Sequence, residues 1–309
     1  MPGTEGRVVS PLVALVVAVL AISTSAILVR WSDAPNVIKA LYRVSFTVVA
    51  LAPLVDGTDR RSLTQIGARD AAIAVAAGVA LAFHFVVWFE SLDHTTVAAS
   101  VTIVQAQPVF VAAGAWVLLG ERVSRRGALG IGVALAGMVA LSFGSELLAV
   151  VDPTATLDTA VAGAQYGNAL ALLGAVAVAA YYLAGRSLRR RLGVLPYVTV
   201  VYTACALVLF AVAVVQGLPL LSYPPHEWLL FGAMALGPGV LGHTVVNWAL
   251  GHLESHVVSV SLLGEPVGST LLALVLLSEV PPPTTLFGGA VVLAGIYVTA
   301  SARTPSGTQ

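Results

Sequence analysis

The chain has 309 residues, of which 58% are hydrophobic and only 10% are charged. Soluble domains carry roughly 25% charged residues. The composition therefore excludes an ordinary soluble protein, a disordered chain and a nucleic-acid binder, and it indicates a helical protein that crosses a membrane several times. The 15 basic and 15 acidic residues balance, so the net charge points to no class of partner. Cys205 is the single cysteine, which excludes an internal disulfide and a cysteine-built metal site.

Ten apolar windows reach or approach the length of about 20 residues that a membrane-spanning helix needs. In chain order they are residues 8–29, 36–55, 71–89, 97–119, 128–143, 166–183, 194–215, 228–250, 257–277 and 286–301. Several windows contain long uninterrupted apolar runs, which favour helices over the alternating strands of a transmembrane barrel. The sequence therefore predicts an all-α integral membrane protein with ten transmembrane helices.

The basic residues gather on one side of these predicted helices. If the N-terminus is cytoplasmic, twelve of the 15 basic residues fall in the two tails and in the loops after the second, fourth and sixth windows. The loops after the third, fifth, seventh and ninth windows contain no lysine or arginine. Because cytoplasmic loops are enriched in these residues, the N- and C-termini are both predicted to be cytoplasmic.

The sequence repeats itself with an offset of 158 residues. Gln-Pro-Val at 107–109 corresponds to Glu-Pro-Val at 265–267, and Gly130 corresponds to Gly288. Each repeat holds five helices, an odd number, so the two repeats must be inverted relative to each other. Inverted repeats are typical of secondary transporters, whose substrate site lies near the middle of the membrane. The predicted units are a first five-helix repeat (8–143), an extracytoplasmic linker (144–165), a second five-helix repeat (166–301) and a cytoplasmic tail (302–309).

Three blocks of the sequence resemble the EamA branch of the drug/metabolite transporter superfamily. They are the segment from Pro35 to Arg43, the block from Pro108 to Glu121, and its counterpart from Glu265 to Glu279. This resemblance implies a ten-helix carrier, often an exporter of metabolites or amino acids. It also implies a central cavity lined mainly by the third, fourth, eighth and ninth helices. It implies no particular substrate.

Polar side chains at membrane depth are costly and usually face protein or a water-filled cavity. His84 and Trp88 stand four residues apart in the third window and share a helix face, as do His243 and Asn247 in the eighth. The residues predicted to line a cavity are His84, Trp88, Gln105, Gln107, Tyr181, His243, Asn247, Trp248 and Glu265. This set suits a small zwitterionic or aromatic metabolite. The alternative is that these side chains only join helices by hydrogen bonds.

Arg43 lies about two helical turns below the predicted outer surface, too deep to reach water easily, and needs a partner. Glu90, at the outer end of the third window, is the most available carboxylate. We therefore expect a structural pair between Arg43 and Glu90. A clamp that binds the carboxylate of a substrate is the alternative role for Arg43.

Glu265 falls near the middle of the 257–277 window. A carboxylate in such a place can accept a proton from one side of the membrane and release it to the other, so Glu265 is the candidate for proton coupling. The alternative is a structural hydrogen bond to the fourth helix, opposite the residue that corresponds to it in the first repeat, Gln107.

Two prolines and two glutamates recur at matching places in the repeats. Pro108 and Pro266 each remove a backbone hydrogen bond inside a predicted helix, so they are either gating hinges or static bends. Glu121 and Glu279 each follow their proline by thirteen residues, and we expect them to cap helix ends or anchor loops.

Small residues mark a predicted packing stripe on the fifth helix. They are Ala128, Gly132 and Ala136, with Ala290 and Ala294 as their counterparts on the tenth helix. Small side chains allow the backbones of membrane helices to approach closely.

The remaining motifs favour neither a metal nor a cofactor. The histidines of His252-x-Glu254-x-His256 lack the spacing of a zinc-binding helix, and the single lysine, Lys39, rules out a Gly-Lys-Ser/Thr phosphate loop. We therefore expect a secondary carrier that exports a small organic metabolite across the plasma membrane of a prokaryote, with the lipid bilayer and protons as further partners. The alternatives are an intramembrane enzyme, for which no nucleophile–base pair is evident, and a structural subunit, which would not explain the buried histidines and carboxylate.

Overall fold

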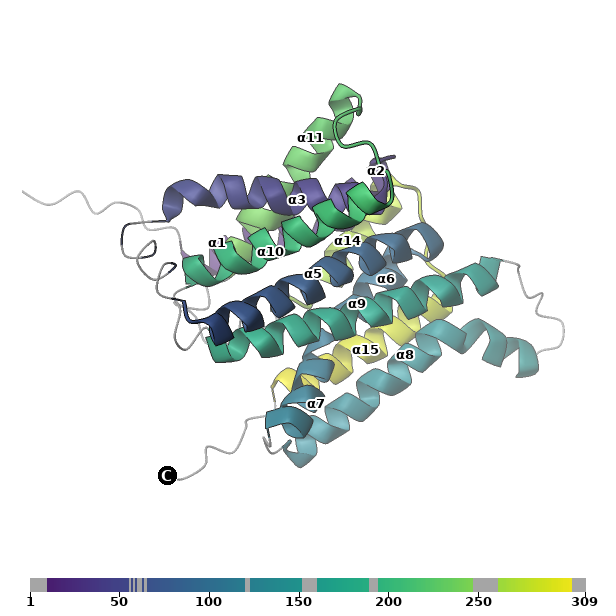
Figure 1. Cartoon of the computed structure of the whole chain (residues 1–309). Helices are drawn as coiled ribbons and strands as arrows, with labels where there is room; N and C mark the ends of the chain where they lie inside the picture. The colour runs from purple at the N-terminus through teal and green to yellow at the C-terminus, as the bar shows by residue number, and fades with distance from the viewer. Residues whose placement is uncertain are drawn as a thin grey trace, which may run out of the picture.

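The structure, a computed structural model, describes residues 10–55, 57, 59, 63, 66–119, 123–151, 160–188, 194–246 and 261–301, and these form helices without any strand. In chain order the helices are α1 (Pro11–Ser23), α2 (Ser25–Trp31), α3 (Asn36–Leu51), η1 (Ala52–Leu54), α5 (Ala68–His94), α6 (Val97–Val104), α7 (Gln107–Leu119), α8 (Arg125–Val151), α9 (Ala160–Leu188), α10 (Val194–Val215), α11 (Pro225–Met234), η2 (Ala235–Thr244), α14 (Gly264–Leu276) and α15 (Pro283–Ala300). They form one bundle, with α11 and α1–α3 at one side and α7, α8 and α15 at the other (Figure 1).

Every predicted apolar window falls on one or more of these helices. Among the described residues, seven helices are long and apolar enough to cross a membrane: Pro11–Trp31, Asn36–Leu54, Ala68–His94, Val97–Val117, Arg125–Phe143, Ala164–Gly185 and Leu195–Val215. The ninth and tenth windows fall on the shorter apolar helices of α14 and α15, and the eighth falls on α11 and the π-helix η2 that continues it. The class of multi-pass helical membrane protein is thereby confirmed.

The first helix shows how these apolar segments are used. Leu15 and Ile22 of α1 are buried in the bundle, whereas Val16 and Leu20 are each 60% exposed. Both faces of the helix are apolar, because one packs on protein and the other would face lipid. Side chains that face the bundle and side chains that face outward are therefore chemically alike.

The two repeats contain helices that are interrupted just before a proline. α6 ends at Val104 and α7 begins at Gln107, with Pro108 in its first turn. In the second repeat, a turn at Leu262–Leu263 precedes α14, and Pro266 lies in its first turn. Proline is tolerated there because the first N–H groups of a helix have no partner inside it. The prolines thus mark breaks that divide the helix, and α7 and α14 begin as new helices inside the bundle.

The fifth helices of the two repeats, α8 and α15, form the most extensive helix pair, and Figure 1 shows them side by side. Glycines make the contact: a Cβ atom added to Gly137 would lie 2.6 Å from the backbone nitrogen of Val292, and one added to Gly295 would lie 2.7 Å from the carbonyl oxygen of Gly130. Residue numbers rise along α8 as they fall along α15, so the two helices run antiparallel. Equivalent helices of inverted repeats are expected to run in this way.

This seam corrects the predicted packing stripe. Ala128, Gly132 and Ala136 are exposed, and no atom lies within 4 Å of a Cβ built on Gly132. Ala290 and Ala294 are exposed as well. A different face of each helix packs, and glycines form it. These glycines correspond to one another at the repeat offset of 158 residues: Gly130 to Gly288 and Gly137 to Gly295.

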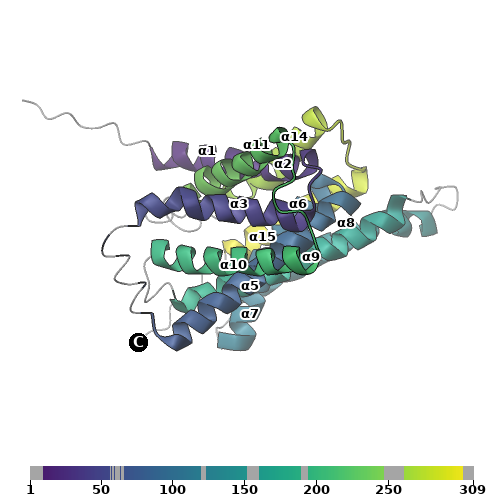
Figure 2. The ribbon, with the colours of Figure 1, turned by 45° about the horizontal axis from the view of Figure 1, so that its top comes forward.

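Contacts between the repeats come in symmetric pairs. α5 packs on α9 as α1 packs on η2, α10 packs on α5 as α3 packs on η2, and α7 packs on α9 as α14 packs on α1. Near the pseudo-twofold axis, α3 packs on α10 and α6 packs on α14. Figure 2 shows the same bundle turned, with α3, α10 and α5 crossing its face. The two halves therefore enclose a shared interior.

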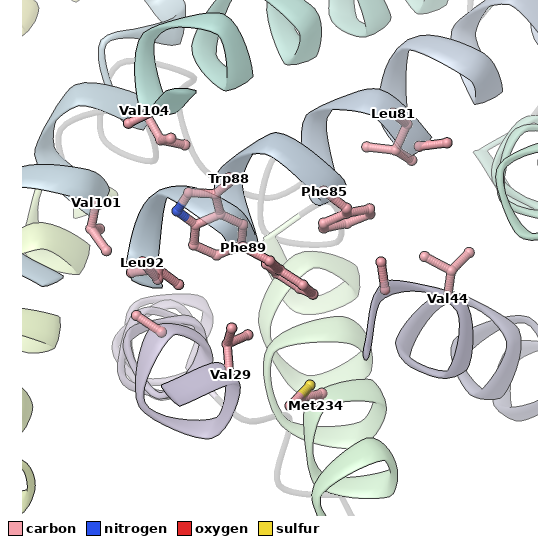
Figure 3. Packing of buried hydrophobic residues seen from close by; sticks show 14 of the residues in the cluster. Val29, Val44, Leu81, Phe85, Trp88, Phe89, Leu92, Val101, Val104 and Met234 are labelled. Carbon is pink, nitrogen blue, oxygen red and sulfur yellow. The ribbon is translucent and has the colours of Figure 1, made fainter. Parts of the chain in front are cut away.

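The interior is filled by apolar side chains from both halves. Val29, Val44, Phe89 and Met234 belong to one buried cluster, and Figure 3 shows them among side chains of α5, α6 and neighbouring helices. Polar side chains are also buried in this interior, and several of them lie around Arg43 and Glu265.

Candidate functional site

Arg43 of α3 is a buried cation of this interior, only 3% exposed. Its Nη1 donates a hydrogen bond to Ser25 Oγ at 2.6 Å, and its guanidinium carbon lies 4.8 Å from the centre of the Phe85 ring. The rings of Trp88 and Phe89 lie 5.8 Å away. Aromatic faces attract a desolvated cation, so the α5 rings and one hydroxyl hold the guanidinium in place.

The expected pair between Arg43 and Glu90 is wrong. Glu90 Oε2 accepts from Asn36 Nδ2 at 2.9 Å, and Glu90 Oε1 lies 3.3 Å from His94 Nε2. Glu90 lies near the end of α5, where it meets the first residue of α3, whereas Arg43 lies two turns deeper along α3. The two side chains share a helix interface but differ in depth.

Glu265 is a buried carboxyl of the second repeat, 7% exposed and in the first turn of α14. It accepts a hydrogen bond from Gln105 Nε2, and Gln107 Nε2 donates to Gln105 Oε1 at 3.3 Å. The chain of side chains thus joins the break between α6 and α7 to the start of α14. Carboxylates are stabilised at helix N-termini by the helix dipole, which helps this one to persist in an apolar interior.

Arg43 and Glu265 come from different repeats and attract each other electrostatically without forming a direct ion pair. Ser23 connects α1 to the same region, because its hydroxyl donates to the Glu265 backbone oxygen at 3.4 Å while its own carbonyl accepts from Ser269 at 3.0 Å. A charged group from each half therefore lies at the interface of the two repeats.

Both histidines predicted from the sequence lie near this pair. Nδ1 of the buried His84 lies 2.8 Å from the Gly174 carbonyl oxygen of α9. A carbonyl only accepts, so Nδ1 carries the proton in this contact and Nε2 is left as an acceptor. His243 of η2 and His84 lie within electrostatic range of Arg43 and of each other.

Trp88 stacks on His84 with 5.7 Å between the ring centres and is 4% exposed. Its indole Nε1 is buried and has no hydrogen-bond partner among the described residues. Figure 3 shows the ring between Val104 and Phe89. Buried donors without a partner are rare in folded proteins, so this N–H is a candidate contact for a bound molecule.

Tyr181 of α9 lies at the edge of the cluster. Its ring stacks on Tyr197 at 6.2 Å, and it interacts electrostatically with Tyr202, which in turn interacts with Arg43. The sequence analysis did not select Tyr202 or Ser25 as site residues. The repeat offset gives the only signal for Tyr202, because the residue before it, Val201, corresponds to Arg43.

Glu279 caps a helix from the loop between α14 and α15. Its Oε1 accepts from the Val97 backbone N–H at 2.6 Å, at the start of α6, and its Oε2 lies 3.4 Å from Arg30 Nη2. Burial raises the pKa of Glu279, while the Val97 N–H and Arg30 oppose this change. Of the other predicted residues, Asn247, Trp248 and Glu121 lie outside the described residues, as do His252, Glu254 and His256.

Comparisons with known proteins agree with this architecture. A model of the EamA-like transporter family matches residues 9–143 and 165–301, close to the repeats predicted from the sequence. A solved chain described as "Crystal structure of protein" is 22% identical, and the match covers 94% of this chain and 96% of that one with a TM-score of 0.61, which shows a similar fold. A search of curated proteins finds no match.

Proposed function

We propose, since the chain belongs to the EamA-like transporter family, that it is a secondary active transporter that exports small organic metabolites such as amino acids. In this proposal it acts in the plasma membrane of a prokaryote. Ten helices cross the membrane as two inverted repeats, both termini are cytoplasmic, and the solute passes by alternating access around a central site.

One arrangement carries the proposal, the buried Arg43 of the first repeat facing the buried Glu265 of the second. Ionisable residues at membrane depth mark functional sites by default. Interrupted helices at the interface of two repeats are typical of substrate sites in secondary transporters. The breaks before Gln107 and Gly264 meet this description, and they are bridged by Gln105.

The charges fit a zwitterionic solute. Its carboxylate would bind Arg43, whose guanidinium has five N–H donors, and its ammonium would bind Glu265. Trp88 Nε1 offers a further donor, and the α5 rings provide an apolar wall.

Proton coupling would follow from competition at Glu265. A proton and the ammonium of the solute both neutralise this carboxylate, so they bind in turn rather than together. A proton that enters from outside would then displace the solute outward, and the proton gradient would drive export. Glu265→Gln keeps the shape of the side chain but cannot titrate.

The test starts from a metabolite-release screen on an overexpressing strain and continues with the released solute in proteoliposomes. We expect gradient-driven accumulation by the natural protein, and passive exchange without accumulation by Glu265→Gln. Glu279→Gln, a carboxylate outside the central cluster, is the matched control and keeps coupling. Unchanged accumulation by Glu265→Gln would remove its coupling role, and failure of the natural protein to move any released solute would overturn transport itself.

A further inference from the structure

A polar cavity lies apart from the central cluster, where α2 ends and α3 begins. Its volume is about 520 Å³, and its wall includes residues from the ends of α2, α3, α5 and α10. Two cations and three carboxylates line it: Arg30, Lys39, Asp33, Glu90 and Asp93. We refer to it as the vestibule.

The two cations of the vestibule, Arg30 and Lys39, differ in how many hydrogen-bond and ion-pair partners they have. Arg30 donates to the Leu92 carbonyl oxygen and lies 3.4 Å from Glu279. Lys39 is 4% exposed and lines the cavity, and its Nζ makes no hydrogen bond or direct ion pair with any described residue. Carboxylates surround it at longer range, with Asp93 foremost. Among the described residues its ammonium is not one of the fully buried unpartnered atoms but borders the cavity, so Lys39 can bind an acceptor there.

The acceptor side of the vestibule is also incomplete. Asn36 Nδ2 donates to Glu90 Oε2 at 2.9 Å and to Asp93 Oδ2 at 2.7 Å. These two carboxylates fix the orientation of the amide, because neither could donate to its oxygen. Asn36 Oδ1 is buried and has no partner in the described part of the chain. It therefore needs a donor, and the neighbouring carboxylates would favour a cationic one.

The Lys39 ammonium and Asn36 Oδ1, which both lack a hydrogen-bond partner among the residues that the structure describes, are close together. Asn36 and Lys39 are three residues apart on α3, and helical residues at this spacing share a face with about 5–6 Å between their Cβ atoms. An α-amino acid carries its carboxylate and its ammonium on one carbon atom, so both could reach their partners at once. Val37 and Val86 also line the cavity and offer an apolar surface to an aliphatic side chain.

We propose that the vestibule binds a zwitterionic α-amino acid, with its carboxylate on Lys39 and its ammonium on Asn36 Oδ1 and the carboxylates of Glu90 and Asp93. A simple anion would leave Asn36 Oδ1 without a donor, and a simple cation would leave Lys39 without an acceptor. The inference deepens the proposed function by adding a second binding site for the headgroup of the solute, and it rests on that function for its place in transport.

The test uses the fact that Lys39 is the only lysine. Reductive methylation of the purified protein in nanodiscs with ¹³C-formaldehyde labels only Lys39 and the N-terminal amine, and the labelled ammonium keeps its charge. After the reagent is removed, L-leucine is titrated and the Lys39 methyl resonance is followed by NMR. The matched probes are 4-methylpentanoate, which lacks the ammonium, and isopentylamine, which lacks the carboxylate.

We expect leucine to shift the Lys39 resonance saturably, and each analogue to bind about tenfold more weakly, as the loss of a charge-assisted hydrogen bond predicts. Arg43→Gln should keep the shift, because it changes only the central site. Leucine binding to unlabelled Lys39→Met should fall, and Lys39→Arg should restore it.

An unshifted Lys39 resonance, an equal response to isopentylamine, or loss of the shift in Arg43→Gln would each overturn the vestibule site. Because no gradient is applied, a normal shift in a protein that transports nothing would leave this site standing while the proposed function failed.

Discussion

The two repeats match closely in the seam between α8 and α15. They differ in the cluster around Arg43. In the seam, Gly130 corresponds to Gly288 and Gly137 to Gly295, and each glycine packs against a residue of the other repeat. In the central cluster the correspondence fails: Arg43 corresponds to Val201 and Gln107 to Glu265. The scaffold keeps its symmetry, and the charged groups break it.

The helices around the cluster differ in the same way. α5 of the first repeat is α-helical where it carries His84, whereas the corresponding part of the second repeat is the π-helix η2, which contains Pro238 and His243. π-Helical segments are frequent at functional sites. Residues that close packing requires must match in both repeats, because each contact is used twice. Residues that bind a solute need not match, because the solute is not symmetric.

The largest expected effect lies in the symmetric seam. Gly137→Val would place a side chain against the backbone of Val292 and Gly288, which cannot move without shifting α15. We expect a loss of about 3 kcal/mol of folding stability, at the upper end for overpacked cores. Thermal unfolding and size-exclusion chromatography of the purified protein measure it.

Gly132→Val is the matched control on the same helix, since a Cβ atom there meets nothing within 4 Å. It should unfold like the natural protein. Equal destabilisation by both variants would show that helix propensity, and not the seam, sets the cost.

An intermediate effect is expected at the asymmetric centre. Arg43→Gln removes the cation and leaves Glu265 without an opposing charge. Truncating one partner of a buried charge pair costs about 2–5 kcal/mol of binding, so the concentration of solute for half-maximal transport should rise about 30-fold or more. Val201→Ala, at the corresponding place in the second repeat, should lower stability alone. Normal transport by Arg43→Gln would place the solute elsewhere.

The smallest expected effect is the pH dependence contributed by Glu279. Its pKa is raised above the ordinary value of 4.5 by burial, so the folded protein holds this proton more tightly than the unfolded chain does. The stabilisation is complete below pH 4.5 and is lost as the pH rises through the raised pKa. The melting temperature of the natural protein relative to Glu279→Gln should therefore decline across this range. A constant difference at all pH values would contradict this reading of the cap.

Several features of the site were predictable from particular residues. The prolines Pro108 and Pro266 predicted irregular points in two helices, which the structure shows as breaks just before them. The rarity of ionisable groups at membrane depth singled out His84, His243 and Glu265. The partner of Arg43 was not predictable, because Ser25 is one of several hydroxyl residues and only the approach of α2 to α3 selects it. Glu90 was the more plausible partner by charge, but depth along the helix decided otherwise.

The sequence by itself determined that the chain is a multi-pass helical protein with two repeats. The reason is that backbone groups in lipid must be satisfied within each segment, so long apolar windows must be helices. The tertiary structure alone decided which face of each helix packs. In α8 the exposed Ala128, Gly132 and Ala136 are small residues, as are the glycines that form the seam. Lipid and protein interior are both apolar, so hydrophobicity cannot tell an outward face from an inward one. Only the approach of a second backbone can.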